Sequence, residues 1–544
     1  MRKDGQFMKI YNGKSIYKGI AIGKIKYMKK TEPDTSRHEI SDIKSEMKRY
    51  DVARKKAILQ LKKIYRDAIS EIGEDAAAIF DVQSMMLEDD DYNESVQSMI
   101  EENKDNAEFA VFNTGEIISS TFAEMDDDYM KARAYDIKDV SLRVVNILCG
   151  NDSESILDDE PVILAIDELT PAETVQMDKS KLLSFVTKYG SSNSHTAILA
   201  RTINIPAVTG VIIDQAWNGK MAIVNGETGE IIIEPDEKTM NKMLKKRKKI
   251  EEEFEILQKL KGMPNRTKSG KEINLYANIG GVEDVEKVLE NDANGIGLFR
   301  SEFLYLGRND YPTEEQQFVA YKNVVRKMKG KKVIIRTLDI GADKKADYFN
   351  LEKEDNPAMG FRAIRICLAC PKLFKTQLRA IYRASAYGTI SIMYPMIISL
   401  QEVQKVKEIS AEVRSELNLD NIPYGDVEQG IMIETPAAVI MSDELACEVD
   451  FFSIGTNDLT QYTLAMDRQN CRLESMFDTH HPAILRQIKT TIDNAHKHNC
   501  WVGICGELAA DLSLTKTFID MGIDELSVSP SSVLPVRQKI REAE

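Results

Sequence analysis

Apolar and polar positions alternate with two different periods along this chain of 544 residues. Within residues 36–148, apolar side chains recur three or four positions apart, as at Ala57, Leu61, Ile64 and Ala68, and glycine is nearly absent. This spacing gathers the apolar side chains on one face of a helix. The segment is therefore predicted to form several helices that pack together as a bundle.

Short apolar runs typical of β-strands flank the predicted bundle on both sides. Residues 15–28 are predicted to form short strands with glycine turns. After the helical segment, strand-like runs return at 162–166, 183–187, 221–224 and 230–233. We interpret residues 8–35 and 149–235 as one small α/β domain, interrupted by the helical insertion.

Residues 236–262 form a highly charged segment of helical character that ends at Gly262-Met263-Pro264. An ordinary surface helix is one explanation of this pattern. The position of the segment between two different folding patterns favours a helical linker between two halves of the chain.

From residue 271 onward, strand-like and helical segments alternate. Eight runs are predicted to be strands, each followed by a helical stretch: 273–279, 295–300, 332–338, 389–395, 430–434, 450–454, 501–505 and 525–528. Eight such β-then-α units are typical of a closed parallel (β/α)8 TIM barrel, which we predict for residues 263–544. An open, doubly wound sheet is the alternative, but the number of units favours closure. The whole chain is thus predicted to be a multidomain α/β protein.

Composition excludes several classes of protein. The formal net charge of −15 argues against a nucleic-acid-binding surface, which needs a basic face. No apolar run approaches the roughly 20 residues that cross a bilayer, and the first residues lack the apolar core of a signal peptide. Seven scattered cysteines do not suggest a disulfide framework. We therefore expect a cytoplasmic enzyme.

Arginines collect where the predicted barrel strands end, which is where active sites lie in this fold. Arg300 and Arg336 follow the second and third strands, and Arg362 and Arg468 lie in adjoining segments. The planar guanidinium fork fits the oxygens of phosphates and carboxylates. A small substrate with two anionic groups is therefore expected at this end of the barrel.

Acidic residues and one thiol lie at the ends of the next strands. Glu434 and Asp458 come from neighbouring strands and could hold Mg²⁺, which takes one or two protein carboxylates together with substrate oxygens and waters. Cys505 could be a core thiol, a nucleophile or a proton donor. With an ordinary pKa of about 8.5 it would be protonated at neutral pH and could act as an acid.

One histidine lies at the junction between a loop and a predicted helix. The run from Gly190 to Arg201 places His195 after a small polar loop, where the free N–H groups of a helix start can hold an anion. An isolated histidine usually caps or packs. Here the loop and the barrel-end charges favour a reactive imidazole, which is a usable nucleophile near neutral pH.

Five stretches of sequence carry a resemblance to a known family: SHTAILAR at 194–201, GIGLFRSEF at 295–303, GIMIETPAA at 430–438, FFSIGTNDLTQY at 451–462 and GICGEL at 503–508. From about Ile16 to the C-terminus, the chain resembles Enzyme I of the phosphoenolpyruvate:sugar phosphotransferase system, the phosphoenolpyruvate–protein phosphotransferases. The resemblance implies that His195 takes the phosphoryl group of phosphoenolpyruvate and passes it to the phosphocarrier protein HPr, releasing pyruvate. It also implies an α/β domain that swivels between the barrel and HPr.

The resemblance assigns roles to further residues. It implies that Thr170 hydrogen-bonds the active histidine and that Cys505 protonates the enol as it becomes pyruvate. Substrate phosphate and carboxylate would be bound by Arg300, Arg336, Arg362, Asn457 and Arg468, and Mg²⁺ by Glu434 and Asp458. The helical insertion would dock HPr, with Glu74, Asp75, Met85, Met86, Asp89, Asp90 and Asp91 as candidates. Members of the family are usually homodimers through the barrel half.

The chain departs from the family's usual pattern at several positions. Asn193 stands in the loop before the histidine where the family usually has threonine, and Ala342 stands where glycine is common. Gln83 replaces a common histidine in the docking segment, and Gln469 replaces a frequent glycine. The chain also ends at Glu544, earlier than many members.

Two other functions are compatible with parts of this pattern. Other phosphoenolpyruvate-using enzymes, of the dikinase or synthase type, share the histidine domain and the barrel. They also need a large nucleotide-binding domain, for which this chain has no room, and the chain has no GxxxxGK[ST] loop. A regulatory relative that only senses phosphoenolpyruvate would not need the histidine, the carboxylates and the thiol that this chain retains.

Overall fold

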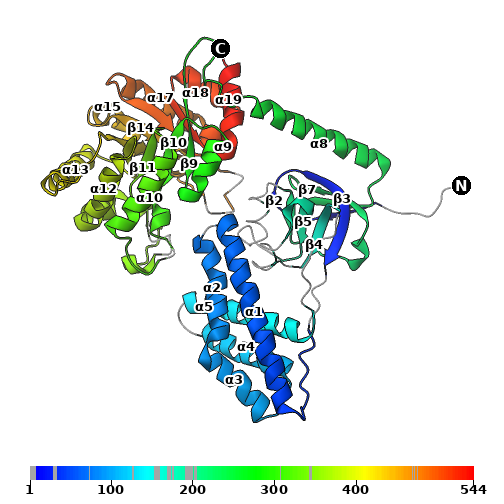
Figure 1. Cartoon of the computed structure of the whole chain (residues 1–544). Coiled ribbons are helices and arrows are strands. Elements are labelled where there is room, and N and C mark those ends of the chain that lie inside the picture. Colours follow the sequence, from blue (N-terminus) through cyan, green and yellow to red (C-terminus); the bar gives the residue numbers. More distant parts are fainter. Residues whose placement is uncertain are drawn as a thin grey trace. The chain divides into compact units, whose positions relative to one another are not determined.

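The computed structural model describes the chain except at residues 1–7, 29–32, 73, 125–127, 152–159, 168, 170–172, 174–176, 190–199, 201–204, 307, 342–345, 469, 471, 474 and 475. At residues 70–72, 74–76, 128–132, 135 and 347 only the backbone is described. The chain divides into two compact units, residues 1–252 and 253–544 (Figure 1). Each unit is described by itself.

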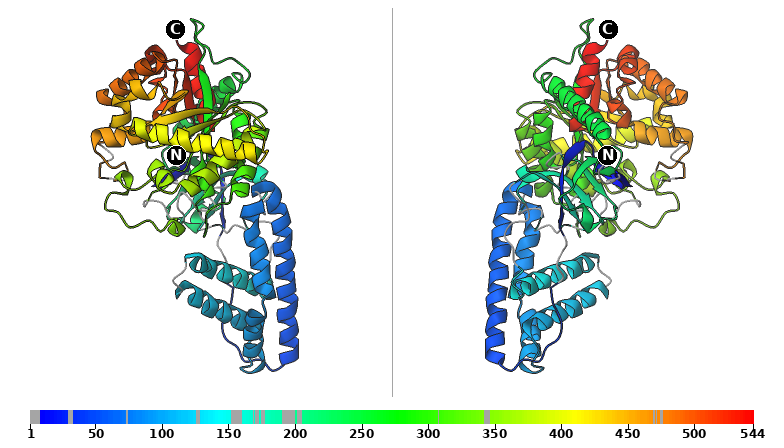
Figure 2. Two further views of the ribbon diagram at one scale, coloured as in Figure 1. Left: turned by 90° about the vertical axis from the view of Figure 1, so that its left-hand side faces the viewer. Right: turned by 90° about the vertical axis from the view of Figure 1, so that its right-hand side faces the viewer.

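The helical insertion of the first unit forms the predicted bundle. Its helices are α1 (Ile43–Ile72), α2 (Glu74–Glu88), α3 (Asp90–Glu101), α4 (Ala107–Glu124) and α5 (Asp128–Leu148). Helices α1 and α2 lie side by side, and α4 packs against α5 (Figure 2). The periodic residues Ala57, Leu61, Ile64 and Ala68 are all buried in the bundle core, which confirms the helical periodicity.

The rest of the first unit is built on an eight-stranded mixed sheet with the order β1-β8-β7-β3-β4-β5-β6-β2. Its strands are β1 (Lys9–Asn12), β2 (Lys14–Tyr17), β3 (Ile20–Met28), β4 (Val162–Ile166), β5 (Leu182–Thr187), β6 (Ala207–Thr209), β7 (Met221–Asn225) and β8 (Glu230–Ile233). Strands β3 and β4 are parallel neighbours although the whole helical insertion separates them in sequence. The bundle therefore leaves and re-enters the sheet at adjacent strands, as expected for an insertion.

The charged segment after β8 forms the long helix α8 (Glu237–Gln258). Most of its side chains are exposed, and Met243 is its buried residue. The division between the two compact units falls within this helix.

The second unit is a closed barrel of eight parallel strands, β9 to β16 in sequence order, with β16 pairing back onto β9. The strands are β9 (Asn274–Ile279), β10 (Gly295–Arg300), β11 (Val333–Arg336), β12 (Ile390–Tyr394), β13 (Glu428–Ile433), β14 (Phe451–Ile454), β15 (Trp501–Ile504) and β16 (Glu525–Val528). The closed barrel was predicted and is confirmed, and each of the eight predicted runs overlaps one strand.

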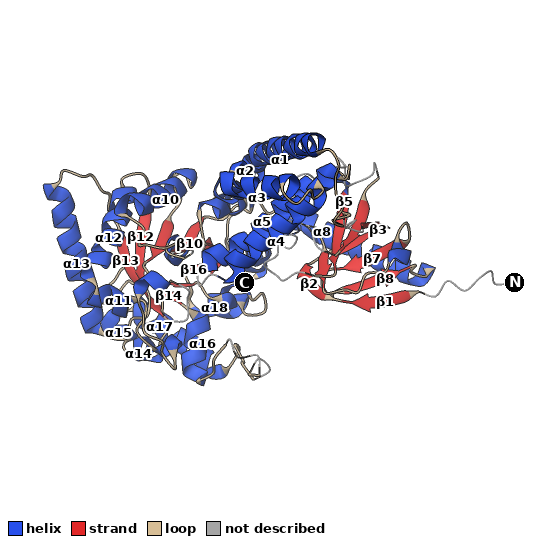
Figure 3. Ribbon diagram, turned by 90° about the horizontal axis from the view of Figure 1, so that it is seen from below, coloured by secondary structure: helices blue, strands red, loops and turns tan. Residues whose placement is uncertain are grey.

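Helices surround the barrel strands on the outside (Figure 3). They are α9 (Val285–Glu290), α10 (Glu314–Lys327), α11 (Ile364–Ala369), α12 (Pro371–Ser385), α13 (Leu400–Leu419), α14 (Pro436–Ile440), α15 (Ser442–Leu445), α16 (Thr456–Leu464), α17 (Pro482–His496), α18 (Thr515–Met521) and α19 (Val533–Glu542). Alternate strand residues face these helices and form one large apolar core with them.

The other strand residues fill the barrel interior. A separate cluster there consists of Tyr276, Leu298, Ile334, Met393, Met432, Phe451 and Cys505. The interior is thus filled with packed side chains, and the polar residues that follow the strands lie at the carboxyl end of the barrel. Among the described residues, no helix is long and apolar enough to cross a membrane.

Candidate active site at the carboxyl ends of the barrel strands

Two arginines lie on neighbouring strands at the carboxyl end of the barrel. Arg300 ends β10 and Arg336 ends β11, and the strand pairing places them directly beside each other. Arg300 is exposed, whereas Arg336 is buried. The barrel therefore presents one exposed and one fixed guanidinium at the same point of its mouth.

Acidic partners hold the buried arginines in place. Arg336 donates through Nη2 to Glu302, and its Nη1 lies 3.0 Å from Asp339 Oδ2. Arg362 donates to the other oxygen of Asp339 at 2.8 Å. Asp339 thus bridges two arginines that are far apart in sequence. Such a network fixes the orientation of both guanidinium planes before any substrate binds.

These carboxylates also keep the arginines charged. Burial alone lowers the pKa of the Arg336 guanidinium, but the negative charges of Glu302 and Asp339 outweigh it and raise the pKa. The same balance of burial against Asp339 raises the pKa of Arg362. Both side chains remain cationic at every physiological pH.

The same end of the barrel also carries a buried carboxylate, two strands further along. Glu434 directly follows β13, and its side chain is 1% exposed. Its Oε1 accepts a hydrogen bond of 2.6 Å from the backbone N–H of Met396, and its Oε2 has no hydrogen-bond partner among the described residues. Burial, followed by the negative charges of Asp458 and Asp339, raises the pKa of Glu434 to about 8.

The surroundings of Glu434 fit a hard divalent cation. Its open oxygen lies 2.8 Å from the position that a Cβ on Gly455 would take, so glycine leaves that oxygen uncovered. Asp458 is close enough to raise the pKa of Glu434 by its charge. No group of three or more metal-ligating side chains gathers among the described residues. Glu434 and Asp458 offer two carboxylates, a number that fits the usual protein contribution to a Mg²⁺ site that substrate oxygens complete.

Helix α16 positions three of the predicted residues. Asp458 and Asn457 lie in its first turn, and Arg468 follows its end. Arg468 Nη2 lies 4.0 Å from Asp458 Oδ1. Asn457 accepts from the backbone N–H of Glu507 at 3.0 Å and donates to Glu507 Oε1 at 3.3 Å. These two bonds join the start of α16, just after β14, to the segment after β15 that follows Cys505.

Cys505 follows β15 and belongs to the packed interior, with 3% exposure. Burial raises the pKa of its thiol to about 12, so the expectation of an ordinary thiol pKa was wrong. How completely this side chain is buried depends on the neighbouring strands and cannot be read from the local sequence. The correction strengthens the underlying inference, because the thiol is protonated at neutral pH and can act as an acid.

Comparisons with known proteins match nearly the whole chain. Three family models match: the PEP-binding domain of PEP-utilising enzymes over residues 255–544, their N-terminal part over 12–133 and their mobile domain over 158–229. The phosphoenolpyruvate-protein phosphotransferase of Bacillus sp. (strain S) is 42% identical over 539 residues, covering 98% of this chain and 93% of the relative. That of Bacillus subtilis is 41% identical over 527 residues, covering 96% and 92%.

The chain belongs to the phosphoenolpyruvate–protein phosphotransferase family. This confirms the predicted family and the predicted class of enzyme, which transfers a phosphoryl group from phosphoenolpyruvate to protein. An NMR structure titled Enzyme I is 32% identical and covers 44% of this chain and 99% of its own, with a TM-score of 0.40. Enzymes of the family use a divalent metal, in keeping with the carboxylate pair described above.

Five of the residues discussed in the sequence analysis lie outside the described part of the chain. They are His195, Thr170, Asn193, Ala342 and Gln469. Their roles remain predictions. Eight of the predicted site residues come together at one end of the barrel: Arg300, Arg336, Arg362, Glu434, Asn457, Asp458, Arg468 and Cys505.

The acidic partners of the arginines were not assigned from the sequence. Glu302 follows Arg300 by two positions, and Asp339 follows Arg336 by three. A buried arginine needs a carboxylate partner, so the acidic residues that follow Arg300 and Arg336 closely in sequence could have been identified as candidates. Tyr462 was also missed: it lies in α16 and donates to the backbone carbonyl of Ala358.

Five of the candidate docking residues lie around the junction of α2 and α3, and the other two, Glu74 and Asp75, begin α2. Met85 is 57% exposed, and Asp90 and Asp91 are exposed in the first turn of α3. Asp89 caps α3 by accepting from the backbone N–H of Tyr92 at 3.0 Å. Met86 is half-buried, and the side chains of Glu74 and Asp75 are outside the described set.

Gln83 does not lie on the exposed surface of the bundle. It is buried and donates to Asp136 at 3.3 Å and to Asp139 at 3.5 Å. It therefore connects α2 to α5 within the bundle. A docked partner would therefore not contact the Gln83 side chain directly.

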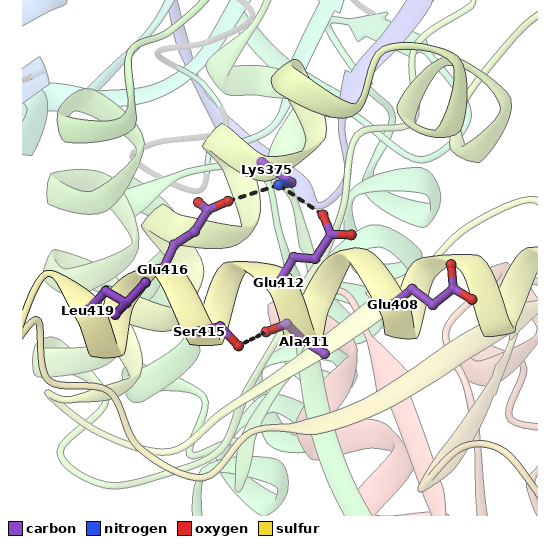
Figure 4. A pocket seen from close by; sticks show the side chains of 7 residues that line it. All are labelled: Lys375, Glu408, Ala411, Glu412, Ser415, Glu416 and Leu419. Carbon is purple, nitrogen blue, oxygen red and sulfur yellow. Dashed lines mark hydrogen bonds and ion pairs between the residues drawn. The ribbon is translucent and has the colours of Figure 1, made fainter.

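A surface hollow on the outside of the barrel is separate from this site. It lies along α13, where Lys375 of α12 pairs with Glu412 at 2.9 Å and with Glu416 at 2.8 Å (Figure 4). Every charged group that the hollow gathers belongs to the outer helices. It has no connection with the strand ends.

Proposed function

We propose that this enzyme takes the phosphoryl group of phosphoenolpyruvate onto His195 and passes it to HPr, releasing pyruvate. One observation carries the proposal: buried, pre-aligned arginines lie at the same barrel mouth as a buried carboxylate with an open oxygen. A substrate that carries both a phosphate and a carboxylate, bound together with a metal, suits both features.

Arginines and an amide would bind the substrate's two anionic groups. Arg336 and Arg362 are held by Asp339 and need no reorientation, whereas Arg300 and Arg468 are exposed and can close on the ligand. Asn457 adds an amide at the start of α16. Phosphoryl transfer depends mainly on positioning and on neutralising charge, which these groups supply.

Glu434 and Asp458 would hold Mg²⁺, and the other ligands would come from substrate and water. When bound, this ion would supply positive charge close to the oxygens of the transferred group. The raised pKa of Glu434 supports this assignment, because a cation would satisfy the charge that burial now disfavours.

His195 would attack the phosphorus atom through a ring nitrogen, and the bond from phosphorus to the enol oxygen would break. Thr170 would orient the imidazole through a hydrogen bond. The match of residues 158–229 to a mobile domain supports the idea that the α/β domain carries this histidine to the barrel and then to HPr.

Cys505 would complete the reaction by protonating the enolate. Its S–H bond breaks, a C–H bond forms at the methylene carbon, and the ketone form of pyruvate leaves. The enol is far less stable than the ketone, so this step drives the transfer. A thiol pKa of about 12 supports the role, because the proton is present at neutral pH.

The helical insertion would bind HPr through Glu74, Asp75, Met85, Met86, Asp89, Asp90 and Asp91. An exposed methionine beside exposed carboxylates suits a partner surface that is apolar at its centre and basic around it. A homodimer through the barrel, implied by the family resemblance, and a location in the cytoplasm, expected from the composition of the sequence, remain predictions.

Labelled phosphoenolpyruvate tests the proposed function. The full-length enzyme is incubated with phosphoenolpyruvate labelled in its phosphoryl group and with Mg²⁺, with and without HPr. We expect acid-labile label on the enzyme, its transfer to HPr, and no label on a His195→Ala variant. Label on the His195→Ala variant, or a requirement for ATP, would overturn the proposal.

A further inference from the structure

Two buried residues of the barrel have a backbone conformation that glycine usually adopts. Among the described residues, ten other than glycine have a positive φ angle, and eight of these are exposed or half-buried. The two that are buried are Ala363, with φ 52°, and Met396, with φ 59°. The backbone N–H of Met396 donates to Glu434, and Ala363 directly follows Arg362. Each of the two therefore adjoins a residue of the candidate active site.

Alanine is an unusual residue at position 363. Its backbone has φ 52° and ψ −124°, and the N–H of Arg365 donates to the carbonyl of Arg362 at 3.1 Å. These angles and this bond place Ala363 at the first central position of a type II′ turn. Glycine is usual at that position because it has no Cβ to clash with the backbone. The methyl group of Ala363 therefore strains a turn that glycine would form without strain.

The turn fixes Arg362 relative to the segment that follows β11. The backbone N–H of Ala363 donates to the carbonyl of Ile340 at 2.9 Å. The guanidinium of Arg362 donates to Asp339, the residue before Ile340, at 2.8 Å. Two adjacent residues are thus bonded to two adjacent residues, one through its backbone and the other through its side chain.

Helix α11 fixes the chain on the other side of Ala363. The helix begins at Ile364, and Ile364, Ile366 and Cys367 are buried in the barrel core. Peptide planes are rigid, so φ and ψ of Ala363 are the angles that join this packed helix to the backbone of Arg362. A change in these angles would move Arg362 away from its place beside Asp339.

Packing is an alternative explanation of the methyl group. Ala363 is 0% exposed and belongs to the apolar core of the barrel. A methyl group that only fills space contributes to stability and leaves substrate affinity unchanged when it is removed. The two explanations therefore differ in what a glycine at this position would change.

We propose that Ala363 is a positioning residue for Arg362. This inference rests on the proposed role of Arg362 in binding the substrate. A Cβ leaves a much smaller range of φ and ψ than glycine has, so the bonds around the turn select one conformation. The guanidinium of Arg362 then stays against Asp339 and meets the substrate without reorientation. Local strain of this kind is typical of residues that pre-organise a site.

The test replaces Ala363 with glycine and measures substrate affinity and stability separately. Phosphoenolpyruvate with Mg²⁺ is titrated into full-length proteins that also carry His195→Ala, which removes the proposed phosphoryl acceptor. If glycine lowers the aligned population of Arg362 to about one fifth, the dissociation constant rises about fivefold, which is the result we expect. The unfolding midpoint should stay within about 3 °C of the parent, because the relieved strain offsets the lost methyl group. Unchanged affinity would overturn the inference, whatever the unfolding midpoint.

A double-mutant cycle shows whether Ala363 acts through Arg362. Asp339 keeps its ion pair with Arg336 when Arg362 is replaced. Arg362→Met should weaken affinity, and Ala363→Gly should add no further loss in that background. The same added loss in both backgrounds would contradict the inference, because Ala363 would then act by another route. No loss in Arg362→Met would refute the proposed substrate role of Arg362, and the inference with it.

Lys329→Gly is the matched control for a change to glycine. Lys329 also has φ 52°, but it is exposed and precedes β11, at the opposite end of the barrel from the arginines. This variant should bind phosphoenolpyruvate within about twofold of the parent. An equal loss of affinity in Lys329→Gly and Ala363→Gly would mean that glycine acts through general flexibility of the barrel, against the inference.

Discussion

The two sides of the barrel mouth carry opposite charges and are balanced in different ways. Beside β10 and β11, each buried charge has a partner, because Arg336 meets Glu302 and Asp339, and Arg362 shares Asp339. Beside β13, Glu434 has one oxygen without a partner, and its nearest charges include two further carboxylates. On the first side, buried arginines and carboxylates form direct ion pairs; on the second, Glu434 forms none with the described residues, and only the charge of Arg336 offsets the two carboxylates.

This difference indicates what each side is built to do. Buried charges cost free energy unless they are paired. The arginine side therefore contributes an orientation that is fixed before ligand binding. The carboxylate side is unfavourable without a ligand and gains most when a cation arrives. A substrate that bridges the two sides would bind a pre-aligned surface and complete the metal's coordination at once.

The largest expected effect comes from removing the open carboxylate. Glu434→Gln should lower the rate of enzyme phosphorylation by about 10³-fold, since metal stabilisation of several kcal/mol is lost. The metal-free variant should unfold at the same or a higher temperature than wild type, because glutamine replaces a buried carboxyl group whose ionised form is unfavourable without a cation. Rapid-quench phosphorylation and thermal unfolding measure the two effects. Lower stability together with normal activity would contradict the comparison.

Breaking the arginine side should have the opposite effect on stability. Arg336→Met leaves Glu302 and Asp339 buried without their shared cation and should lower the free energy of unfolding by about 3–5 kcal/mol. Arg266→Met removes an exposed arginine paired with Glu272 and should change it by no more than about 1 kcal/mol. Chemical denaturation measures both variants. Equal losses in the free energy of unfolding would mean that the buried arginine network contributes no more to stability than an exposed ion pair.

The thiol of Cys505 should contribute more to the rate of pyruvate formation than to the affinity for substrate. Cys505→Ala should slow the first formation of pyruvate by about 10²-fold, with substrate affinity changed by less than about threefold. Cys500→Ala is the matched control, because Cys500 is buried in the outer core rather than in the barrel interior. Single-turnover kinetics and calorimetric titration separate the two quantities. A loss of affinity without a slower first turnover would refute proton donation.

A smaller effect concerns the pH dependence of stability. The pKa of Glu525 is raised in the folded protein above its ordinary value of 4.5, so the folded state holds a proton that the unfolded state releases. Its contribution to stability is complete below about pH 4.5 and is lost as the pH rises. The unfolding temperature of wild type should therefore fall, relative to that of Glu525→Gln, as pH increases. Parallel curves for the two proteins would show that Glu525 does not titrate in this range.

The smallest effect is expected at the exposed acidic cluster of the bundle. Asp90 and Asp91 are solvated, so any attraction to a basic partner is screened by salt, unlike the charges inside the barrel. Binding of HPr should weaken as ionic strength rises, and Asp90→Asn with Asp91→Asn should reduce that dependence. Surface plasmon resonance at several salt concentrations measures it. An affinity that does not vary with salt would remove the electrostatic argument.

The fold was largely predictable because periodicity identifies both helices and barrel strands. Strand ends were less predictable: the run 332–338 was predicted, whereas β11 spans Val333–Arg336. Apolar residues such as Leu338 continue past the strand because the loop itself packs into the core. Local apolar character therefore marks burial, not the last ladder hydrogen bond.

The charge network could not be predicted from local pattern. Arg336 and Glu302 are separated by 34 positions, and Arg362 and Asp339 by 23, so only the closed barrel brings them together. The burial of Cys505 likewise depends on the side chains of neighbouring strands. Sequence identified which groups collect at the strand ends, and the structure showed which of them already have partners.

Calorimetric titration of phosphoenolpyruvate into the full-length enzyme, with and without Mg²⁺ at constant ionic strength, tests the comparison of the two sides most directly. We predict binding that is at least about tenfold tighter with Mg²⁺, because the substrate then meets both sides of the mouth. This gain should disappear in Glu434→Gln. Equal affinity with and without Mg²⁺ in the wild-type enzyme would contradict the account.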